Sequence, residues 1–205
     1  MQEKKLYIIS GCNGAGKTTA SFNILPDLLN CKEFVNADEI ARGLSPFKPE
    51  SVSIEAGRLM LKRIKELINS NQDFSFETTL SSKSFIKIID SARSRGYYIT
   101  LIFFWLESIE LAKDRVKKRV SEGGHNIETD VIERRYKAGI KNLFKLYCDK
   151  VDSLLIYDNS KAESELIAEK EIENDFFTVH HSQKFNALKM KINEQERERN
   201  SEREN

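Results

Sequence analysis

The sequence has few cysteines, no excess of charge of either sign and no long apolar run. Its three cysteines (Cys12, Cys31 and Cys148) are too few and too irregularly spaced for a disulfide framework or a metal knuckle, and they suit a reducing compartment. The 33 basic and 32 acidic residues leave a net charge of +1, which argues against a protein that tracks a polynucleotide backbone. The longest apolar stretch, residues 97–106, has the length of a buried strand and is too short for a membrane span. The N-terminus carries only a short apolar run before Ser10, unlike a signal peptide. We therefore expect a soluble cytoplasmic protein that binds neither membranes nor nucleic acid.

Apolar runs alternate with helical patterns along most of the chain. The apolar runs that predict strands are 6–10, 34–38, 74–78, 97–106 and 153–160. The segments with helical patterns are 17–29, 51–69, 84–96, 108–121 and 132–147. This alternation predicts an α/β fold, a three-layer sandwich in which helices cover both faces of a mainly parallel five-stranded sheet.

The C-terminal part of the chain has a different composition. A weak apolar stripe of Phe185, Leu188 and Ile192 precedes the mixed-charge run "NEQERERNSEREN". Such a run is usually a solvated helix or a frayed end. We predict one domain over residues 1–180 and a charged helical tail over 181–205.

A glycine-rich loop follows the first predicted strand and precedes the first predicted helix. Its pattern G-x-x-x-x-G-K-T runs from Gly11 to Thr18. In a loop between a strand and a helix, this pattern lets the backbone N–H groups surround and bind phosphate oxygens. Lys17 then reaches the outer phosphates, and the Thr18 hydroxyl binds Mg²⁺. We expect the residues that hold ATP to be Gly11, Asn13, Gly14, Ala15, Gly16, Lys17, Thr18 and Thr19. The chain lacks the N-K-x-D element of GTPases and is short for a motor ATPase, so a compact P-loop kinase fits best.

Two carboxylates end predicted strands that should open toward this loop. Asp38 ends the second strand and Glu77 ends the third, and ligands gather at the carboxyl ends of parallel strands. We assign Asp38 as the base for the acceptor hydroxyl, and Glu77 as a group that binds the acceptor or a water on the metal. The alternative is that both acids cap nearby helices.

Arginines gather around a glycine break that we expect to form a lid over residues 115–136. Arg115 and Arg119 share one helix face, and Gly123 and Gly124 follow. Guanidinium groups on such an element stabilise a transferred phosphoryl group, and we choose Arg119 for this role. The alternative is a solvated helix. The lone His125 of this loop is also a candidate.

Several segments together resemble the zeta-toxin family of small P-loop kinases. They are "SGCNGAGKTTA", "VNADEIARGLSPF", "FETTLSS", "RVKKRVSEGGHNI", "VIERRY" and "IYDNS", within residues 4–160. The resemblance implies a P-loop NTPase fold with a nucleoside-kinase-like core, ATP and Mg²⁺ as cofactors, and UDP-N-acetylglucosamine as the acceptor. It also implies a small helical antitoxin as a partner.

The same resemblance implies roles for individual residues. It assigns the catalytic aspartate to Asp38, acceptor contacts to Glu77 and Thr79, and a phosphate-binding arginine to Arg119. The short chain and the "EGGHN" loop depart from the best-studied members. Three residues therefore compete as the second phosphate-clamping group, namely His125, Arg134 and Arg135, of which we place His125 and Arg134 among the substrate-binding residues.

The sequence thus predicts an ATP-dependent phosphotransferase. The alternatives are a kinase for another small hydroxyl compound, such as a nucleoside, antibiotic or metabolite, and a nucleotide-dependent regulator that acts through the charged tail.

Overall fold

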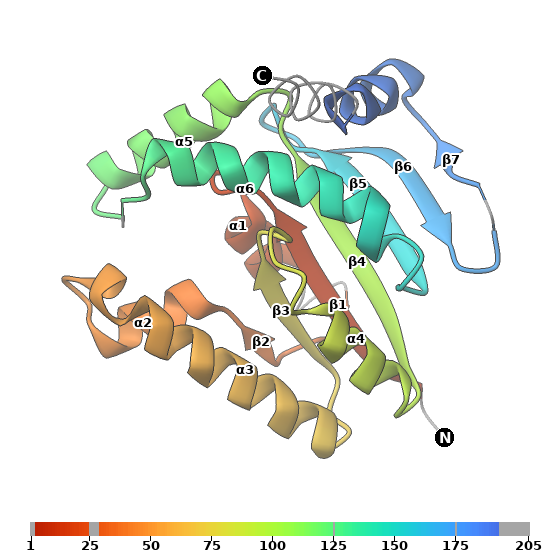
Figure 1. Cartoon of the computed structure of the whole chain (residues 1–205), viewed down its shortest axis with the longest axis horizontal. Helices are drawn as coiled ribbons and strands as arrows, with labels where there is room; N and C mark the ends of the chain where they lie inside the picture. Colours follow the sequence, from red (N-terminus) through yellow and green to blue (C-terminus); the bar gives the residue numbers. More distant parts are fainter. Residues whose placement is uncertain (1–2, 25–28, 125, 175, 193–205) are drawn as a thin grey trace, which may run out of the picture.

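The sheet of the computed structural model runs through the middle of the molecule, with helices on either side (Figure 1). The structure describes residues 3–24, 29–124, 126–174 and 176–192. Within these residues the sheet has seven strands in the order β2-β3-β1-β4-β5-β6-β7. The strands are β1 (Lys4–Gly11), β2 (Phe34–Val35), β3 (Phe74–Thr78), β4 (Tyr97–Trp105), β5 (Ser153–Asp158), β6 (Glu165–Glu171) and β7 (Thr178–Val179).

Helices fill most of the connections between the strands. They are α1 (Lys17–Ile24), α2 (Ala37–Leu44), the 3₁₀ turn η1 (Pro49–Val52), α3 (Ser53–Asn69), α4 (Ile86–Arg93), α5 (Ile109–Ser121), α6 (Thr129–Asn142) and the π-helical turn η2 (Leu143–Tyr147). A further helix covers residues 182–192. Among the described residues, no helix has the length and apolarity needed to cross a bilayer.

The first five strands are parallel, as the sequence predicted. β1 lies between β3 and β4, which places the glycine loop after β1 at the centre of the sheet edge. Residues 6–11 of β1 are all buried, so side chains on both faces of this strand are covered. The α/β fold and the mainly parallel sheet are confirmed.

Two antiparallel strands that the sequence analysis did not predict extend the sheet. β6 pairs with β5, and β7 pairs with β6. Phe185, Leu188 and Ile192 of the 182–192 helix are buried in the same core as the parallel strands. The apolar stripe assigned to a solvated tail is therefore packed. The rest of the predicted tail, residues 193–205, lies outside the described residues.

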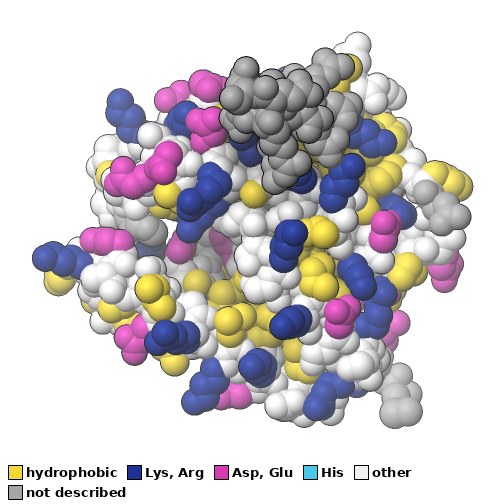
Figure 2. All heavy atoms as spheres, viewed as in Figure 1, with side chains coloured by type: hydrophobic (Ala, Val, Ile, Leu, Met, Phe, Trp, Pro, Cys, Tyr) yellow, Lys and Arg dark blue, Asp and Glu magenta, His cyan; other side chains and the backbone are white. Residues whose placement is uncertain are grey.

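Charged side chains of both signs are spread over the face shown in Figure 2. The surface is hollowed on the left of this view, in the region between α5 and α2 of Figure 1. This hollow lies beside the glycine loop.

Candidate active site

The glycine loop between β1 and α1 has a backbone that only glycine allows at three positions, of which Gly11 and Gly16 meet the closest neighbours. Gly11 has φ +142°, and a Cβ there would stand 2.3 Å from the backbone oxygen of Phe104. Gly16 has φ +79°, and its Cβ would stand 2.5 Å from Asn159 Nδ2. Both positions are strained for any side chain and have no space for one. The loop therefore fits tightly against β4 and against the residues after β5.

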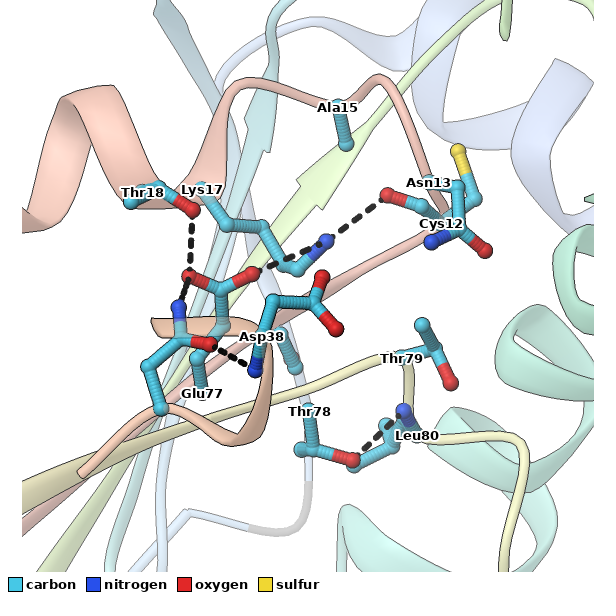
Figure 3. Close-up of polar contacts among 12 residues, drawn as sticks. Cys12, Asn13, Ala15, Lys17, Thr18, Asp38, Glu77, Thr78, Thr79 and Leu80 are labelled. Carbon is cyan, nitrogen blue, oxygen red and sulfur yellow. Dashed lines mark hydrogen bonds and ion pairs between the residues drawn. The ribbon is translucent and has the colours of Figure 1, made fainter. Parts of the chain in front are cut away.

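Lys17, the first residue of α1, holds its ammonium group under this loop. The side chain is only 6% exposed. Nζ donates a 2.9 Å hydrogen bond to the backbone oxygen of Cys12 and lies 3.4 Å from Glu77 Oε1 (Figure 3). A buried lysine so placed is ready to exchange these oxygens for those of a phosphate.

Glu77, near the end of β3, joins three segments of the site. Its Oε2 accepts a 2.7 Å hydrogen bond from Thr18 Oγ1 and a 2.8 Å bond from Asn36 Nδ2. Its Oε1 faces Lys17. The carboxylate thus lies between α1 and the start of α2. The Thr18 hydroxyl and the Glu77 carboxylate are hard oxygen ligands of the kind that Mg²⁺ prefers.

Asp38 does not end a strand, and here the sequence-based expectation was wrong. β2 stops at Val35, and Asn36 is the N-cap of α2, with Oδ1 accepting from the backbone N–H groups of Asp38 and Glu39. This cap starts the helix before the strand could reach residue 38. Asp38 lies in the first turn of α2, is exposed, and points into the space between the loop and Thr79 (Figure 3).

Two adjoining pockets form a cleft over the loop. The inner pocket, about 250 Å³, is lined by Asn13, Gly14, Gly16, Lys17, Thr18, Thr19, Asp38, Glu77, Arg115 and Arg119. The outer pocket, about 330 Å³, is lined by Thr18, Thr19, Phe22, Asp38, Glu39, Arg42, Pro49 and Arg119. Asp38 and Arg119 line both pockets. They therefore stand where the two meet.

The structure separates the four arginines that the sequence grouped together. Arg119 lines both pockets, whereas Arg115 lines only the inner one and donates from Nη1 and Nη2 to the backbone oxygens of Asn159 and Ser160, at 2.8 and 2.9 Å. Arg134 is exposed on α6. Its neighbour Arg135 reaches the glycine loop, where Nη1 donates a 3.2 Å bond to Asn13 Oδ1.

Arg135 is also electrostatically unusual. Burial lowers the pKa of its guanidinium, with a further lowering from Arg134, and the charge of Asp38 only partly opposes this. Its positive charge is thus incompletely balanced by the protein. A partly buried cation of this kind beside a phosphate loop favours a bound anion.

Another candidate residue, Thr79, does not join the cluster under the loop. Thr79 follows β3, and its Oγ1 lies 2.8 Å from Ser81 Oγ. His125 lies outside the described residues. The adjacent glycines form a turn that ends α5: Gly123 has φ +88°, and the Gly124 N–H donates 2.8 Å to the backbone oxygen of Arg119. The turn therefore ends α5 after Ser121.

Two asparagines that shape this site were not among the site residues predicted from the sequence. Asn36 both caps α2 and binds Glu77. Asn159 donates 2.7 Å from Nδ2 to the backbone oxygen of Ala15. The signal for Asn36 was present, because an asparagine followed by two acidic residues is a helix start. Asn159 depends on a contact between residues distant in sequence, which no local pattern reveals.

Comparison with known proteins identifies the family. The zeta toxin family model matches residues 1–171. This chain belongs to the zeta toxin family. A Haemophilus influenzae protein described as uncharacterized is 34% identical over 137 residues, which cover 66% of this zeta toxin homologue and 94% of that protein.

Solved structures share the fold at low sequence identity. A chain from the AvrRxo1-ORF1:-ORF2 structure with ATP has a TM-score of 0.72 at 18% identity, with 91% of this chain and 63% of that chain covered. This zeta-toxin chain thus spans less than two thirds of its length. A chain from the PezAT chromosomal toxin-antitoxin system of Streptococcus pneumoniae has a TM-score of 0.63 at 13% identity, covering 95% and 88%. Family and fold together support an ATP-dependent, kinase-type phosphotransferase.

Proposed function

We propose that this zeta-toxin family protein transfers the γ-phosphate of ATP to a hydroxyl of a small acceptor, with UDP-N-acetylglucosamine as the best candidate. The observation that carries the proposal is the cluster of Lys17, Thr18 and Glu77 under the glycine loop, with Asp38 where the two pockets meet. The inner pocket takes the ATP phosphates and the outer pocket takes the acceptor.

The backbone amides of the loop, from Gly11 through Thr19, hold the triphosphate together with the Lys17 side chain. Lys17 leaves the carbonyl of Cys12 for a phosphate oxygen, a change that needs little movement because the ammonium is already under the loop. The Thr18 hydroxyl and the Glu77 carboxylate would hold Mg²⁺ directly or through water. Bound Mg²⁺ supplies positive charge to the phosphate oxygens.

Asp38 accepts the proton of the acceptor hydroxyl. The acceptor oxygen forms a bond to the γ-phosphorus as the bond from this phosphorus to the ADP oxygen breaks, and the proton moves to the Asp38 carboxylate. Its exposed position between the pockets suits a group that meets a substrate. Thr79, which directly follows β3, contacts the acceptor.

Arg119 and Arg135 stabilise the charge of the phosphoryl group in transfer. Arg119 lines both pockets, and Arg135 reaches the loop at Asn13. Of the candidates for the second clamping group, Arg135 is supported better than Arg134, which is exposed on α6. His125 remains a candidate on sequence grounds alone.

The outer pocket supports an acceptor with both a ring and an anionic part. Phe22 and Pro49 offer apolar surface, while Arg119 and Arg42, the latter paired with Glu39 at 2.9 Å, supply guanidinium groups. A sugar nucleotide combines a base with a diphosphate, and its sugar carries the hydroxyl to be phosphorylated. The toxin-antitoxin system among the structural neighbours supports a small helical antitoxin as a partner of this protein.

The test is to incubate the purified protein with ATP, Mg²⁺ and UDP-N-acetylglucosamine and to follow products by mass spectrometry. We expect a phosphorylated sugar nucleotide that disappears in Lys17→Ala. ADP formation without this product would retain the kinase-type site and exclude this acceptor, and a panel of nucleosides, antibiotics and sugars would then be screened. Absence of any Lys17-dependent ADP would contradict the proposed function.

A further inference from the structure

A chain of polar contacts leads from the 182–192 helix to the glycine loop. It begins at Lys184, whose Nζ lies 2.6 Å from Asp158 Oδ2, at the end of β5. The same ammonium group also pairs with Glu165 of β6. Lys184 therefore joins the C-terminal helix to the strand that ends beside the site.

Asp158 is a buried carboxylate, only 4% exposed. Its Oδ1 accepts a 2.9 Å hydrogen bond from the Ser160 backbone N–H and another from the Ser160 hydroxyl. Burial raises the pKa of Asp158, but the hydrogen bonds from Lys184 and Ser160 outweigh burial and hold the pKa below its usual value. The carboxylate thus stays charged and keeps the turn at residues 158–160 closed.

Further donors fix this 158–160 turn in place. The Glu107 backbone N–H donates 2.9 Å to Ser160 Oγ. Arg115 donates to the backbone oxygens of Asn159 and Ser160, as described above. The turn is held from β4, from α5 and, through Asp158, from the C-terminal helix.

The last contact reaches the glycine loop itself. Asn159 Nδ2 donates 2.7 Å to the backbone oxygen of Ala15, and Ser164 Oγ donates 2.6 Å to Asn159 Oδ1. The Ser164 bond orients the amide, because Asn159 Oδ1 is then the acceptor and Nδ2 faces Ala15. Gly16 leaves the space that this amide occupies. A shift of the 158–160 turn would therefore move the loop.

We propose that Lys184 is a positioning residue for the nucleotide site, acting through Asp158 and Asn159 on the glycine loop without touching the ligand. The inference rests on the proposed binding of a nucleoside triphosphate by this loop. Without Lys184, the Asp158 carboxylate loses its cation in a buried position, and the turn rearranges to rehydrate it. The loop amides are then less well placed for the phosphates, and triphosphate affinity falls.

Lys189 provides a matched control on the same helix. Its Nζ lies 4.6 Å from the ring centroid of Phe185 and 5.8 Å from that of Phe177. Lys189 thus helps the helix to pack but has no part in the chain of contacts to Asp158. Loss of either lysine affects the helix, and only loss of Lys184 should affect the loop.

The experiment is a calorimetric titration of the full chain with β,γ-imido-ATP and Mg²⁺, with folding checked by circular dichroism and thermal melting. We expect Lys184→Met to bind roughly tenfold more weakly than the wild type, the size of one lost charge-assisted hydrogen bond. Lys184→Arg should recover most of the affinity. Lys189→Met should stay within about twofold.

Equal affinities for Lys184→Met and the wild type would overturn the inference while leaving the proposed function intact. Equal weakening by Lys189→Met would also overturn it, because the effect would then come from helix packing. A wild-type protein that does not bind the analogue would contradict both proposals. If Lys184→Met melts below the assay temperature, Lys184→Gln is compared in wild-type and Asp158→Asn backgrounds. If the inference holds, Lys184→Gln lowers the affinity for β,γ-imido-ATP by less than about twofold when Asp158 is already replaced by Asn.

Discussion

The two sides of the sheet use polar groups in different ways. On the parallel side, Lys17, Glu77 and Asn36 are largely buried and bind one another beneath a cleft. On the antiparallel side, polar pairs such as His180 with Glu169, at 2.9 Å, lie at the surface and join neighbouring elements. Polar groups of the first kind can exchange their partners for a ligand, whereas those of the second kind fix the position of a strand or a helix.

The difference implies that the two sides respond differently to substitution. On the parallel side, substitution of an exposed cleft residue such as Asp38 should remove activity and leave stability nearly unchanged, because such a residue contributes little to packing. Changes in the antiparallel side and its helix should lower stability and leave the chemical step nearly unchanged. The following predictions test this contrast.

The largest effect should come from Asp38→Asn. Loss of the base should lower the rate of phosphoryl transfer about 10³-fold, because a carboxamide cannot accept the proton. The melting temperature and the affinity for β,γ-imido-ATP should stay close to wild type, since Asp38 is exposed and Asn has the same shape. Initial rates and calorimetry measure both. The control is Asp90→Asn on α4, an exposed aspartate 3.7 Å from Lys150, which should leave the rate unchanged. An Asp38→Asn rate within tenfold of wild type would exclude the assigned role.

Leu188→Ala should give the largest loss of stability on the antiparallel side. Leu188 is fully buried in the 182–192 helix, and its truncation should cost about 3 kcal/mol of unfolding free energy. Denaturant unfolding measures this, and kcat below the unfolding transition should be retained. Met190→Ala, at a residue 60% exposed on the same helix, should cost no more than about 0.5 kcal/mol. Equal costs for the two would show that the helix is not packed as described.

A comparison of Arg135→Met with Arg134→Met separates two neighbours on α6. Arg135 contacts the loop at Asn13, so its loss should lower kcat about 10²-fold. Arg134 is exposed, and its loss should change kcat by less than about threefold. Steady-state kinetics with saturating ATP distinguishes them. The reverse order would assign the clamp to Arg134, one of the three candidates that the sequence left open.

The smallest predicted effect is a change in pH dependence at Asp158. The pKa of Asp158 is lower in the folded state than in the unfolded state, where it is about 4. The carboxylate therefore stabilises the fold at pH values above the unfolded-state pKa, and this stabilisation is lost as the pH falls through the folded-state pKa. Asp158→Asn should be about 1 kcal/mol less stable at pH 7. The difference in unfolding free energy between the wild type and Asp158→Asn should become smaller below about pH 4. Urea unfolding between pH 3 and pH 7 measures this difference. A gap that is constant with pH would contradict the assigned ionisation.

The parallel half could be predicted from the sequence because its signals are local. The glycine loop carries the phosphate-binding pattern G-x-x-x-x-G-K-T, and the strands are continuous apolar runs bounded by turns. β6, with the sequence ELIAEKE, mixes charged and apolar residues because part of it is exposed. β6 is a strand because it pairs with β5. The sequence of the segment alone does not reveal this pairing.

The choice between Arg134 and Arg135 was within reach of the sequence. The buried positions of α6 include Ile132, Tyr136 and Gly139. Arg135 follows Ile132 by three residues and precedes Gly139 by four, so it lies beside the buried face, whereas Arg134 points away from it. The helical phase could therefore have predicted that Arg135, and not Arg134, reaches the glycine loop. The prediction that Asp38 ends a strand was wrong for another reason, because Asn36, which caps α2, was included in the predicted strand 34–38.

Asn36 has a consequence for how the two substrates are brought together. Its Oδ1 fixes the backbone of Asp38 at 2.8 Å, while its Nδ2 binds Glu77, also at 2.8 Å. In the proposed reaction, this one amide group would set the spacing between Glu77, on the side of the phosphate donor, and Asp38, on the side of the acceptor. Under that proposal, mutations that reshape the outer pocket would change which hydroxyl compound enters, while the geometry of attack would stay the same as long as this amide is in place. The acceptor could then diversify in evolution without a new arrangement of the reacting groups.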